Sequence, residues 1–276
     1  MSDIKGSVVI TDRAGARIHS YAAPEDGWRV TSHIVEGPTR LVLFDGQLIN
    51  AYADEVADCA AAIGKPVDRI IVSHGHPDHW AGLEALARLF PDVPIHALEG
   101  VSAFVQQAGP TMLAGLQRLL GDRVASTVTR PTHALTVGAA VIDGIRFEFQ
   151  EVLDAESDRQ LVALLPEQRA ILAFDLVFSA RQHLFTTTKH FDHWVGLLDD
   201  LKQQQDYDLL LIEHDAPVDF SAIDATVAYL RRAAQIYAAS ASGADYAAAL
   251  KAAFPERADG AWADFSGRRL FPAPQA

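Results

Sequence analysis

The stretch "IIVSHGHPDHWAG", Ile70–Gly82, concentrates metal-ligating residue types at the end of an apolar run. Four such side chains fall within six positions: His74, His76, Asp78 and His79. The run that precedes them, "DRIIVS", is short, apolar and β-branched, which predicts a buried strand. A capping Asp beside exposed histidines is the alternative, but it does not account for three imidazoles in one short loop. We therefore interpret the stretch as a metal-binding loop that follows a strand.

The spacing within this loop favours an extended segment over a helix. The glycine and the proline between the histidines disfavour a helix, and an i, i+2 pair does not share a helical face. In an extended segment, His74 and His76 project to the same side. Asp78 and His79 can then face a second point where the next helix begins. Imidazole with carboxylate suits zinc, iron or manganese rather than calcium. Four ligands in one loop indicate two ions, each of which needs further ligands from elsewhere.

The bulk composition predicts a soluble globular protein. The chain has 276 residues and a formal net charge of −13, which argues against a nucleic-acid partner. The single cysteine, Cys59, excludes an internal disulfide framework. The first residues show no secretory pattern, and no apolar run is long enough to span a bilayer. We expect a cytoplasmic protein that acts on a small molecule and has no membrane partner.

Strand and helix patterns mix in both halves of the chain, which predicts one layered α/β (α+β) domain over residues 1–276. Gly37 and Pro38 predict a hairpin, and Gly64 is expected to end an Ala-rich helix. The pair Gly109-Pro110 is expected to break a helix over residues 101–121. Two Ala-rich helices predict a helical C-terminal extension from about residue 221.

At this point the sequence resembles a known family. "SHGHPDHWAG" is similar to the His-x-His-x-Asp-His motif of the metallo-β-lactamase superfamily, including the following helix start and Gly82. The resemblance extends to the order of elements from about Trp28 to Pro217. It implies a four-layer αβ/βα sandwich, with two mixed β-sheets flanked by helices and the metals at the shared edge of the sheets.

The family implies a further ligand where this chain departs from the usual residue. That ligand is normally a His just before a strand, whereas "LDAESDRQLVALLPE" supplies Glu156. This resembles the alkylsulfatase branch, in which a Glu in a similar Ala-Glu context is a ligand. Asp154 and Asp158 are nearby rivals. A carboxylate in place of an imidazole adds negative charge and favours metals that prefer oxygen.

Two more ligand positions follow from the resemblance. Asp175 ends the strand-like "AILAFD", where burial without a partner would be costly. His214 lies in "LLLIEHDAPVD", where the family often has Gly-His-Gly. The resemblance thus implies one site built from His74, His76 and Glu156, a second built from Asp78, His79 and His214, and a bridging Asp175.

Such a centre implies a binuclear metal-dependent hydrolase that uses a metal-bridging hydroxide on a small ester-type substrate: a lactone, a sulfate ester or a phosphoester. We expect two divalent ions, zinc in the first place, with iron or manganese as alternatives. Asp78 is expected to be catalytic by orienting the nucleophile. In the loop Ser179–Trp194, His183 is the candidate catalytic proton donor, and His183, His190 and Trp194 are candidates for substrate binding. Ordinary loop polarity and core packing are the alternative for each.

Two other functions remain open from the sequence. One is an iron-dependent oxidoreductase of the same superfamily, of the dioxygenase or oxygen-reductase type. The other is a metal-poor relative that binds a ligand without catalysis, since the usual third His is missing. The segment 101–121 and the C-terminal helices are expected either to narrow the pocket or to form a homodimer contact, and the sequence does not choose between the two.

Overall fold

The structure is a computed structural model that describes residues 5–258 and 260–272. It contains two mixed β-sheets. The first has the order β1-β2-β3-β4-β5-β6-β7, with β1 Ser7–Arg13, β2 Ala16–Ala22, β3 Thr31–Glu36, β4 Leu41–Phe44, β5 Val67–Val72, β6 Ile95–Ala97 and β7 His133–Ala134. The second has the order β12-β11-β10-β9-β8, with β8 Gly138–Ile142, β9 Ile145–Leu153, β10 Arg159–Leu165, β11 Ala170–Phe174 and β12 Leu209–Ile212.

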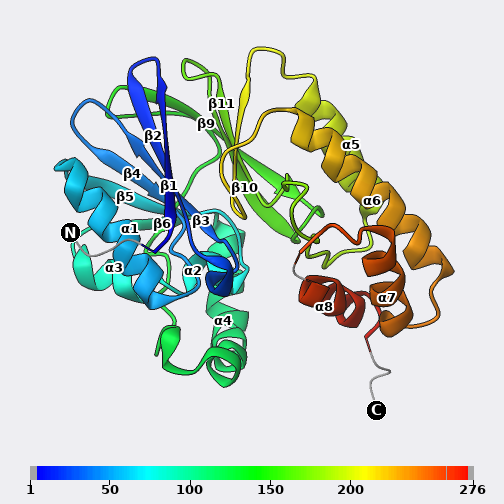
Figure 1. The fold of residues 1–276 in the computed structure, drawn as a ribbon. Coiled ribbons are helices and arrows are strands. Elements are labelled where there is room, and N and C mark those ends of the chain that lie inside the picture. Colours follow the sequence, from blue (N-terminus) through cyan, green and yellow to red (C-terminus); the bar gives the residue numbers. More distant parts are fainter. Residues whose placement is uncertain (1–4, 259, 273–276) are drawn as a thin grey trace.

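The helices lie on the outer faces of the two sheets (Figure 1). The first half of the chain supplies α1 Asn50–Ile63, α2 Pro77–Trp80, α3 Leu83–Leu89 and α4 Glu99–Leu120. The second half supplies α5 Phe191–Lys202, α6 Ser221–Ala239, α7 Gly243–Ala253 and α8 Gly260–Leu270. Two short 3-10 helices, η1 Glu25–Gly27 and η2 Gly121–Arg123, complete the secondary structure of the described residues.

The alternation of side chains along β10 shows why the two sheets stack between helices. Leu161, Ala163 and Leu165 point into a core shared with the first sheet. Val162 and Leu164 point the other way, into a second core formed with α5 and α6. Because successive side chains of a strand face opposite sides, one apolar strand can serve both cores. The layers are therefore helix, sheet, sheet and helix, as the family resemblance implied.

Several local predictions are confirmed. β3 and β4 form the expected antiparallel hairpin, and the Gly37 N–H donates to the carbonyl of Arg40 across its turn. Helix α1 ends at Gly64, which has a φ of 78°. This left-handed conformation is one that glycine adopts without the steric cost of a Cβ.

The predicted break at Gly109-Pro110 is wrong, because α4 continues through Pro110 as one helix. A proline in a helix interior costs about 3 kcal/mol. One face of α4 carries a row of buried residues: Val101, Val105, Gly109, Leu113 and Leu116. Burying each large aliphatic side chain contributes roughly 1.5–3 kcal/mol, so the packing of this face outweighs the local cost.

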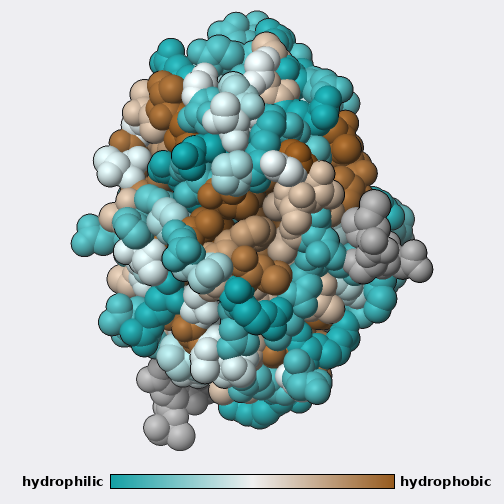
Figure 2. Space-filling view, turned by 90° about the vertical axis from the view of Figure 1, so that its left-hand side faces the viewer, coloured by the Kyte–Doolittle hydropathy of each residue, from teal (hydrophilic) through white to brown (hydrophobic). Residues whose placement is uncertain are grey.

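Strand β1 and helix α8 have no counterpart among the predicted elements. Strand β1 lies at the edge of the first sheet, and its Val8, Val9 and Ile10 are exposed, so it carries no buried periodicity. Helix α8 packs on α7 through Gly243 and Gly267, where an added Cβ would lie within 2.4 Å of the facing carbonyl oxygen. On the face turned toward the viewer in Figure 2, hydrophobic residues gather in a band across an otherwise largely hydrophilic surface.

The two sheets meet directly at the end of β5. His74 forms a β-bridge with Gln160, and the Leu161 N–H donates to the carbonyl of Ser73 at 2.9 Å. A similar junction joins the start of β3 to the residue after β12, because the Thr31 N–H donates to the carbonyl of Glu213 at 2.6 Å. These backbone contacts bring the loop after β5 beside the ends of β10 and β12. Among the described residues, no helix is long and apolar enough to span a membrane.

Candidate metal centre

The predicted ligands come from five places in the chain that meet where the sheets join. The loop after β5 carries His74 and His76, and α2 carries Asp78 and His79. The β9–β10 loop carries Glu156, and the segments after β11 and β12 carry Asp175 and His214. The structure thus brings all seven side chains together, and all are buried.

Backbone conformation and close packing fix the shape of the loop that carries His74 and His76. His76 is extended, with φ −71° and ψ 140°, and Pro77 occupies the first turn of α2. Gly75 packs so closely on Phe104 that a Cβ there would lie 2.4 Å from the ring. The indole of Trp80 donates to the Gly75 carbonyl at 2.9 Å. These contacts place the imidazole rings of His74 and His76 on one side of the loop.

The first group of ligand atoms surrounds Glu156. Its Oε1 lies 3.0 Å from Nδ1 of His76, and its Oε2 lies 3.5 Å from Nε2 of His74. Oδ2 of Asp175 lies 3.7 Å from the same His74 nitrogen. The exposed Asp154 and Asp158, the rivals of Glu156 in the sequence, are absent from this group.

The second group shares Asp175. Its Oδ2 lies 3.3 Å from Nε2 of His79 and 3.4 Å from Nε2 of His214. Oδ2 of Asp78 lies 3.5 Å and 3.4 Å from the same two nitrogens. One carboxylate oxygen of Asp175 therefore faces both groups.

Unpaired polar atoms test whether these residues fit metal ions. Both carboxylate oxygens of Glu156, Oδ1 of Asp175, and Nε2 of His79 and of His214 are buried without a hydrogen-bond partner among the described residues. Leaving a buried polar group unpaired costs about 1–3 kcal/mol, and more for charged groups. The Glu156 oxygens and the two Nε2 atoms lie 3.0–3.5 Å from other ligand atoms without hydrogen-bond geometry, so they converge on common points. Mixed imidazole and carboxylate donors suit two divalent ions of the zinc, iron or manganese kind.

A second set of contacts surrounds the Nδ1 atoms of His74, His79 and His214, on the side of each ring away from the proposed metal ions. Nδ1 of His74 lies 2.9 Å from the Ser73 hydroxyl, and Nδ1 of His214 donates to the carbonyl of Trp28 at 2.9 Å. Nδ1 of His79 lies 3.0 Å from Oε2 of Glu213. The hydrogen bonds with Ser73 and Trp28 fix the tautomer so that the other ring nitrogen is free to bind a metal. Glu213 faces Nδ1 of His79 as a charge, without hydrogen-bond geometry.

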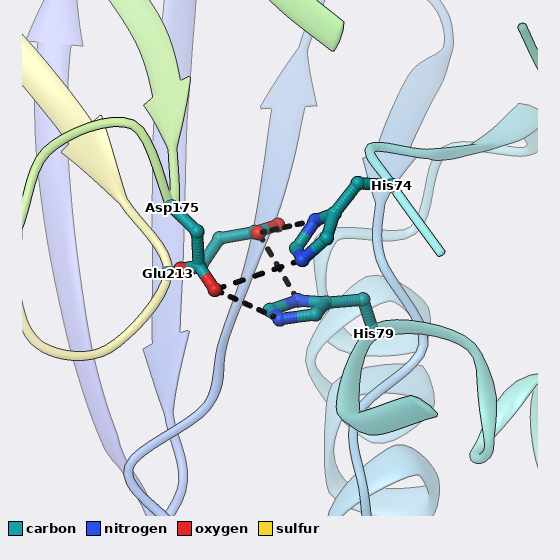
Figure 3. Close-up of side chains that lie close together, drawn as sticks. All are labelled: His74, His79, Asp175 and Glu213. Carbon is teal, nitrogen blue, oxygen red and sulfur yellow. Dashed lines mark ion pairs between the residues drawn. The ribbon is translucent and has the colours of Figure 1, made fainter. Parts of the chain in front are cut away.

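Glu213 and Asp45 are buried site residues that the sequence reading did not assign. Figure 3 shows Glu213 and Asp175 each facing the rings of both His74 and His79, Glu213 at the Nδ1 atoms and Asp175 at the Nε2 atoms. Asp45 accepts hydrogen bonds from the backbone and hydroxyl of Ser73 and lies 3.4 Å from Nδ1 of His79. A signal existed for Asp45, because it ends the apolar run "LVLF" as Asp175 ends "AILAF".

The electrostatics of the cluster favour bound cations. Burial raises the pKa of Glu156 to about 7. Burial also raises the pKa of Asp175, but the neighbouring His214 and His79 outweigh it and hold that pKa well below its usual range. Burial lowers the pKa of His214, yet Asp175 beside it outweighs burial and raises it to about 10. The carboxylates thus draw positive charge into a buried space, which a divalent ion would supply.

The three other candidate residues do not lie in the cluster. His183 is buried, and its Nδ1 lies 3.1 Å from the Tyr229 hydroxyl on α6. His190 is exposed at the start of α5, and the buried indole of Trp194 donates to the carbonyl of Leu176. His183 thus faces α6, His190 faces solvent and Trp194 faces the second core. Their proposed roles in catalysis and substrate binding stay predictions. From the same loop, Phe185 approaches the centre, with its ring centroid 5.4 Å from that of His76.

Comparison with known proteins agrees with this geometry. Residues 26–214 match the family model described as the metallo-beta-lactamase superfamily. An uncharacterized protein of Bacillus subtilis (strain 168), YobT, is 30% identical over 115 residues, covering 41% of this chain and 48% of YobT. A linear primary-alkylsulfatase of Pseudomonas sp. (strain ATCC 19151) is 26% identical over 220 residues, covering 67% of this chain and 41% of the sulfatase. The matched regions span less than half the length of both relatives.

Solved structures share the fold at low sequence identity. A metallo-beta-lactamase from Pontibacter korlensis aligns with a TM-score of 0.63 at 19% identity, over 82% of this chain and 99% of that one. The mono-zinc form of FIM-1 from Pseudomonas aeruginosa aligns with a TM-score of 0.62 at 17% identity, over 82% and 96%. At these identities the likeness establishes the fold alone.

Proposed function

Because the chain belongs to the metallo-beta-lactamase superfamily, we propose that it is a hydrolase with two metal ions, zinc in the first place, that cleaves an ester-type bond in a small molecule. The observation that carries the proposal is Asp175, whose Oδ2 faces ligand nitrogens of both groups at 3.3–3.7 Å. A shared carboxylate of this kind is expected where two ions act together on one bond.

The proposed roles of the residues follow from their positions. When bound, a pair of divalent ions supplies a hydroxide nucleophile near neutral pH and polarises the bond under attack. His74, His76 and Glu156 would hold one ion, and Asp78, His79 and His214 the other. Asp78 also borders a cleft that leads to the centre, so its carboxylate can orient the nucleophile as well as help hold an ion.

The position of Glu156 bears on the alternatives. A vacant third position would have favoured a mono-iron dioxygenase or a metal-poor binding protein. Instead, Glu156 is fully buried with both oxygens directed at His74 and His76. A complete first group supports a two-metal centre over a mono-iron dioxygenase or a metal-poor binding protein.

The substrate class is narrowed by one relative. A linear primary-alkylsulfatase is among the matches, and the Glu156 position resembles the alkylsulfatase branch. We therefore place sulfate esters first among the substrates to be tested, followed by lactones and phosphoesters.

Elemental analysis of the purified protein, followed by an activity screen of those three substrate classes, tests the proposal. We expect two zinc ions per chain and metal-dependent hydrolysis of at least one class. Asp175→Asn should abolish turnover, whereas Asp143→Asn, which alters a carboxylate that binds Thr39 at the surface, should not. Iron with oxygen consumption, or no metal after supplementation, would reject the hydrolase.

A further inference from the structure

A cleft of about 410 Å³ opens directly onto the metal centre. Its inner end is formed by three of the proposed ligands: His76, Asp78 and Asp175. Its walls come from α4 on one side and α8 on the other, which lie near each other in Figure 1. A cleft of this size, next to polar groups that converge at one end, is typical of a small-molecule site.

The walls of this cleft are almost entirely nonpolar. Apart from the three ligands, no residue that lines it among those described carries a titratable side chain. The walls are formed mainly by Trp28, Met112, Leu116, Leu119, Trp262 and Phe265. Leu119 is 60% exposed and Phe265 is 38% exposed. Large apolar side chains left open to solvent in a concave site indicate a nonpolar ligand.

The C-terminal helix α8 contributes the part of this wall that touches the metal ligands. The ring centroid of Trp262 lies 4.9 Å from that of His214 and 5.7 Å from those of Trp28 and Phe185. Trp262 lies outside residues 26–214, the part of the chain that matches the family model. The hydroxyl of Ser266 accepts from the Thr186 N–H at 2.9 Å, which ties α8 to the loop that carries Phe185. The helix is therefore fixed in place over the centre.

We propose that α4 and α8 form a specificity site for a hydrocarbon group of the substrate. This group fills the nonpolar cleft while the bond to be cleaved lies at the metal centre. The inference rests on the proposed function, and it names the class: esters of anionic acids that carry an alkyl chain. The binding energy would come from burial of the chain against the aromatic and aliphatic walls.

A neighbouring cavity provides the internal control. It has a volume of about 400 Å³ and shares His76, Met112 and Phe185 with the cleft. Ala108, on α4, lines this cavity and not the cleft, whereas Leu119, on the same helix, lines the cleft and not the cavity. Leu119→Asp and Ala108→Asp are thus the same change of charge on one helix, at two different pockets.

The test uses alkylphosphonates with chains of increasing length, below their micelle concentrations, on the metal-loaded protein. Binding is followed by calorimetry and by intrinsic tryptophan fluorescence, to which Trp28 and Trp262 in the cleft contribute. In the wild type, the Kd should fall about three- to fourfold for each added methylene until the cleft is full. Leu119→Asp should remove most of this dependence on chain length, and Ala108→Asp should leave it unchanged.

Other outcomes would overturn the inference. A Kd that does not depend on chain length, no binding of any member, or an equal effect of both variants would reject α4 and α8 as a hydrocarbon site. Failure of the hydrolase proposal is distinguishable, because chain-length-dependent binding without turnover of any ester would leave the cleft assigned and remove the reaction.

Discussion

Glu213 should control the affinity of both metal groups, although we do not propose it as a ligand. Its Oε2 lies 3.0 Å from Nδ1 of His79 and 4.0 Å from Nδ1 of His74, the two rings that we assign to different ions. With Nε2 bound to a metal, the negative charge of Glu213 favours a proton on Nδ1 of His79. Its effect on His74 passes through the Ser73 hydroxyl, which bonds Nδ1 of His74 and donates to Oε2 of Glu213 at 3.2 Å. Loss of such a partner usually lowers metal affinity 10- to 100-fold.

We therefore expect Glu213→Gln to weaken zinc binding at both positions by about tenfold, or about 1.4 kcal/mol for each ion. The amide keeps an acceptor oxygen but loses the negative charge. Glu213→Ala, which removes the acceptor oxygen as well, should lower the zinc affinity by close to 100-fold. Zinc affinity is measured by competition with a chromophoric chelator, and cobalt substitution reports the coordination spectrum.

Glu55→Gln is the matched control. Glu55 is also a buried glutamate, but it accepts from the Tyr21 hydroxyl at 2.8 Å and lies outside the metal groups. Its substitution should leave zinc affinity unchanged. The reasoning would be refuted if both Glu213 variants bound zinc as the wild type does, or if Glu55→Gln weakened binding equally.

Four further predictions concern metal content, stability and pH. Glu156→Ala should lower bound zinc from two ions to one per chain by elemental analysis, whereas the exposed Asp158→Ala should retain two. Removal of zinc by a chelator should lower the Tm, since a ligand at 1,000 times its Kd stabilises by about 4 kcal/mol, and an unchanged Tm would contradict a shared centre. Ser242→Ala should cost about 1 kcal/mol in urea unfolding, because the Ser242 hydroxyl caps α7 by accepting from the Asp245 N–H. Burial lowers the pKa of His33 from 6.5 to about 4. The stability that comes from burying the neutral ring is therefore fully present above pH 6.5, and about 3 kcal/mol of the free energy of unfolding is lost as the pH falls toward 4. The metal-free His33→Gln variant should show a correspondingly shallower pH dependence of unfolding than the metal-free wild type.

The metal-binding loop could be predicted because its signal is local. Imidazoles and a carboxylate after an apolar strand need partners wherever the strand ends, and this requirement is visible in Ile70–Gly82 alone. The family resemblance then directed attention to Glu156, Asp175 and His214, which the structure brings to the same place. The four-layer fold followed from the same resemblance and from the mixture of strands and helices.

The positions of Asp45 and Glu213 at strand ends are visible in the sequence, but the role of each depends on which strand ends become neighbours. Each residue ends a buried strand, but only the packing of the two sheets places both beside His79. His183 illustrates the converse. Its loop is polar and follows Asp175, yet the chain there pairs with Ala258, and this pairing turns His183 toward Tyr229.

Helix α8 was the least predictable part of the candidate site, whereas α6 and α7 are the two Ala-rich helices predicted from about residue 221. Helix α8 contains two glycines and a short apolar face, so its sequence carries little intrinsic preference for a helix. Its position depends on the close contact of Gly243 with Gly267, which no local pattern reveals. The nonpolar wall that it contributes to the cleft therefore became visible only in three dimensions.

The junction of the sheets at Ser73 and Leu161 has a consequence for how the protein acquires its structure. Four ligands lie at residues 74–79, after a strand of the first sheet, and the other three lie at residues 156–214, beside strands of the second sheet, so each group contains residues far apart in sequence. Neither group exists until the two sheets have docked, which is a late, non-local event in folding. A metal ion added during refolding should therefore speed folding little and slow unfolding strongly, since contacts that form after the transition state act mainly on the unfolding rate. The bound ions would thus stabilise the folded protein kinetically, by slowing its unfolding.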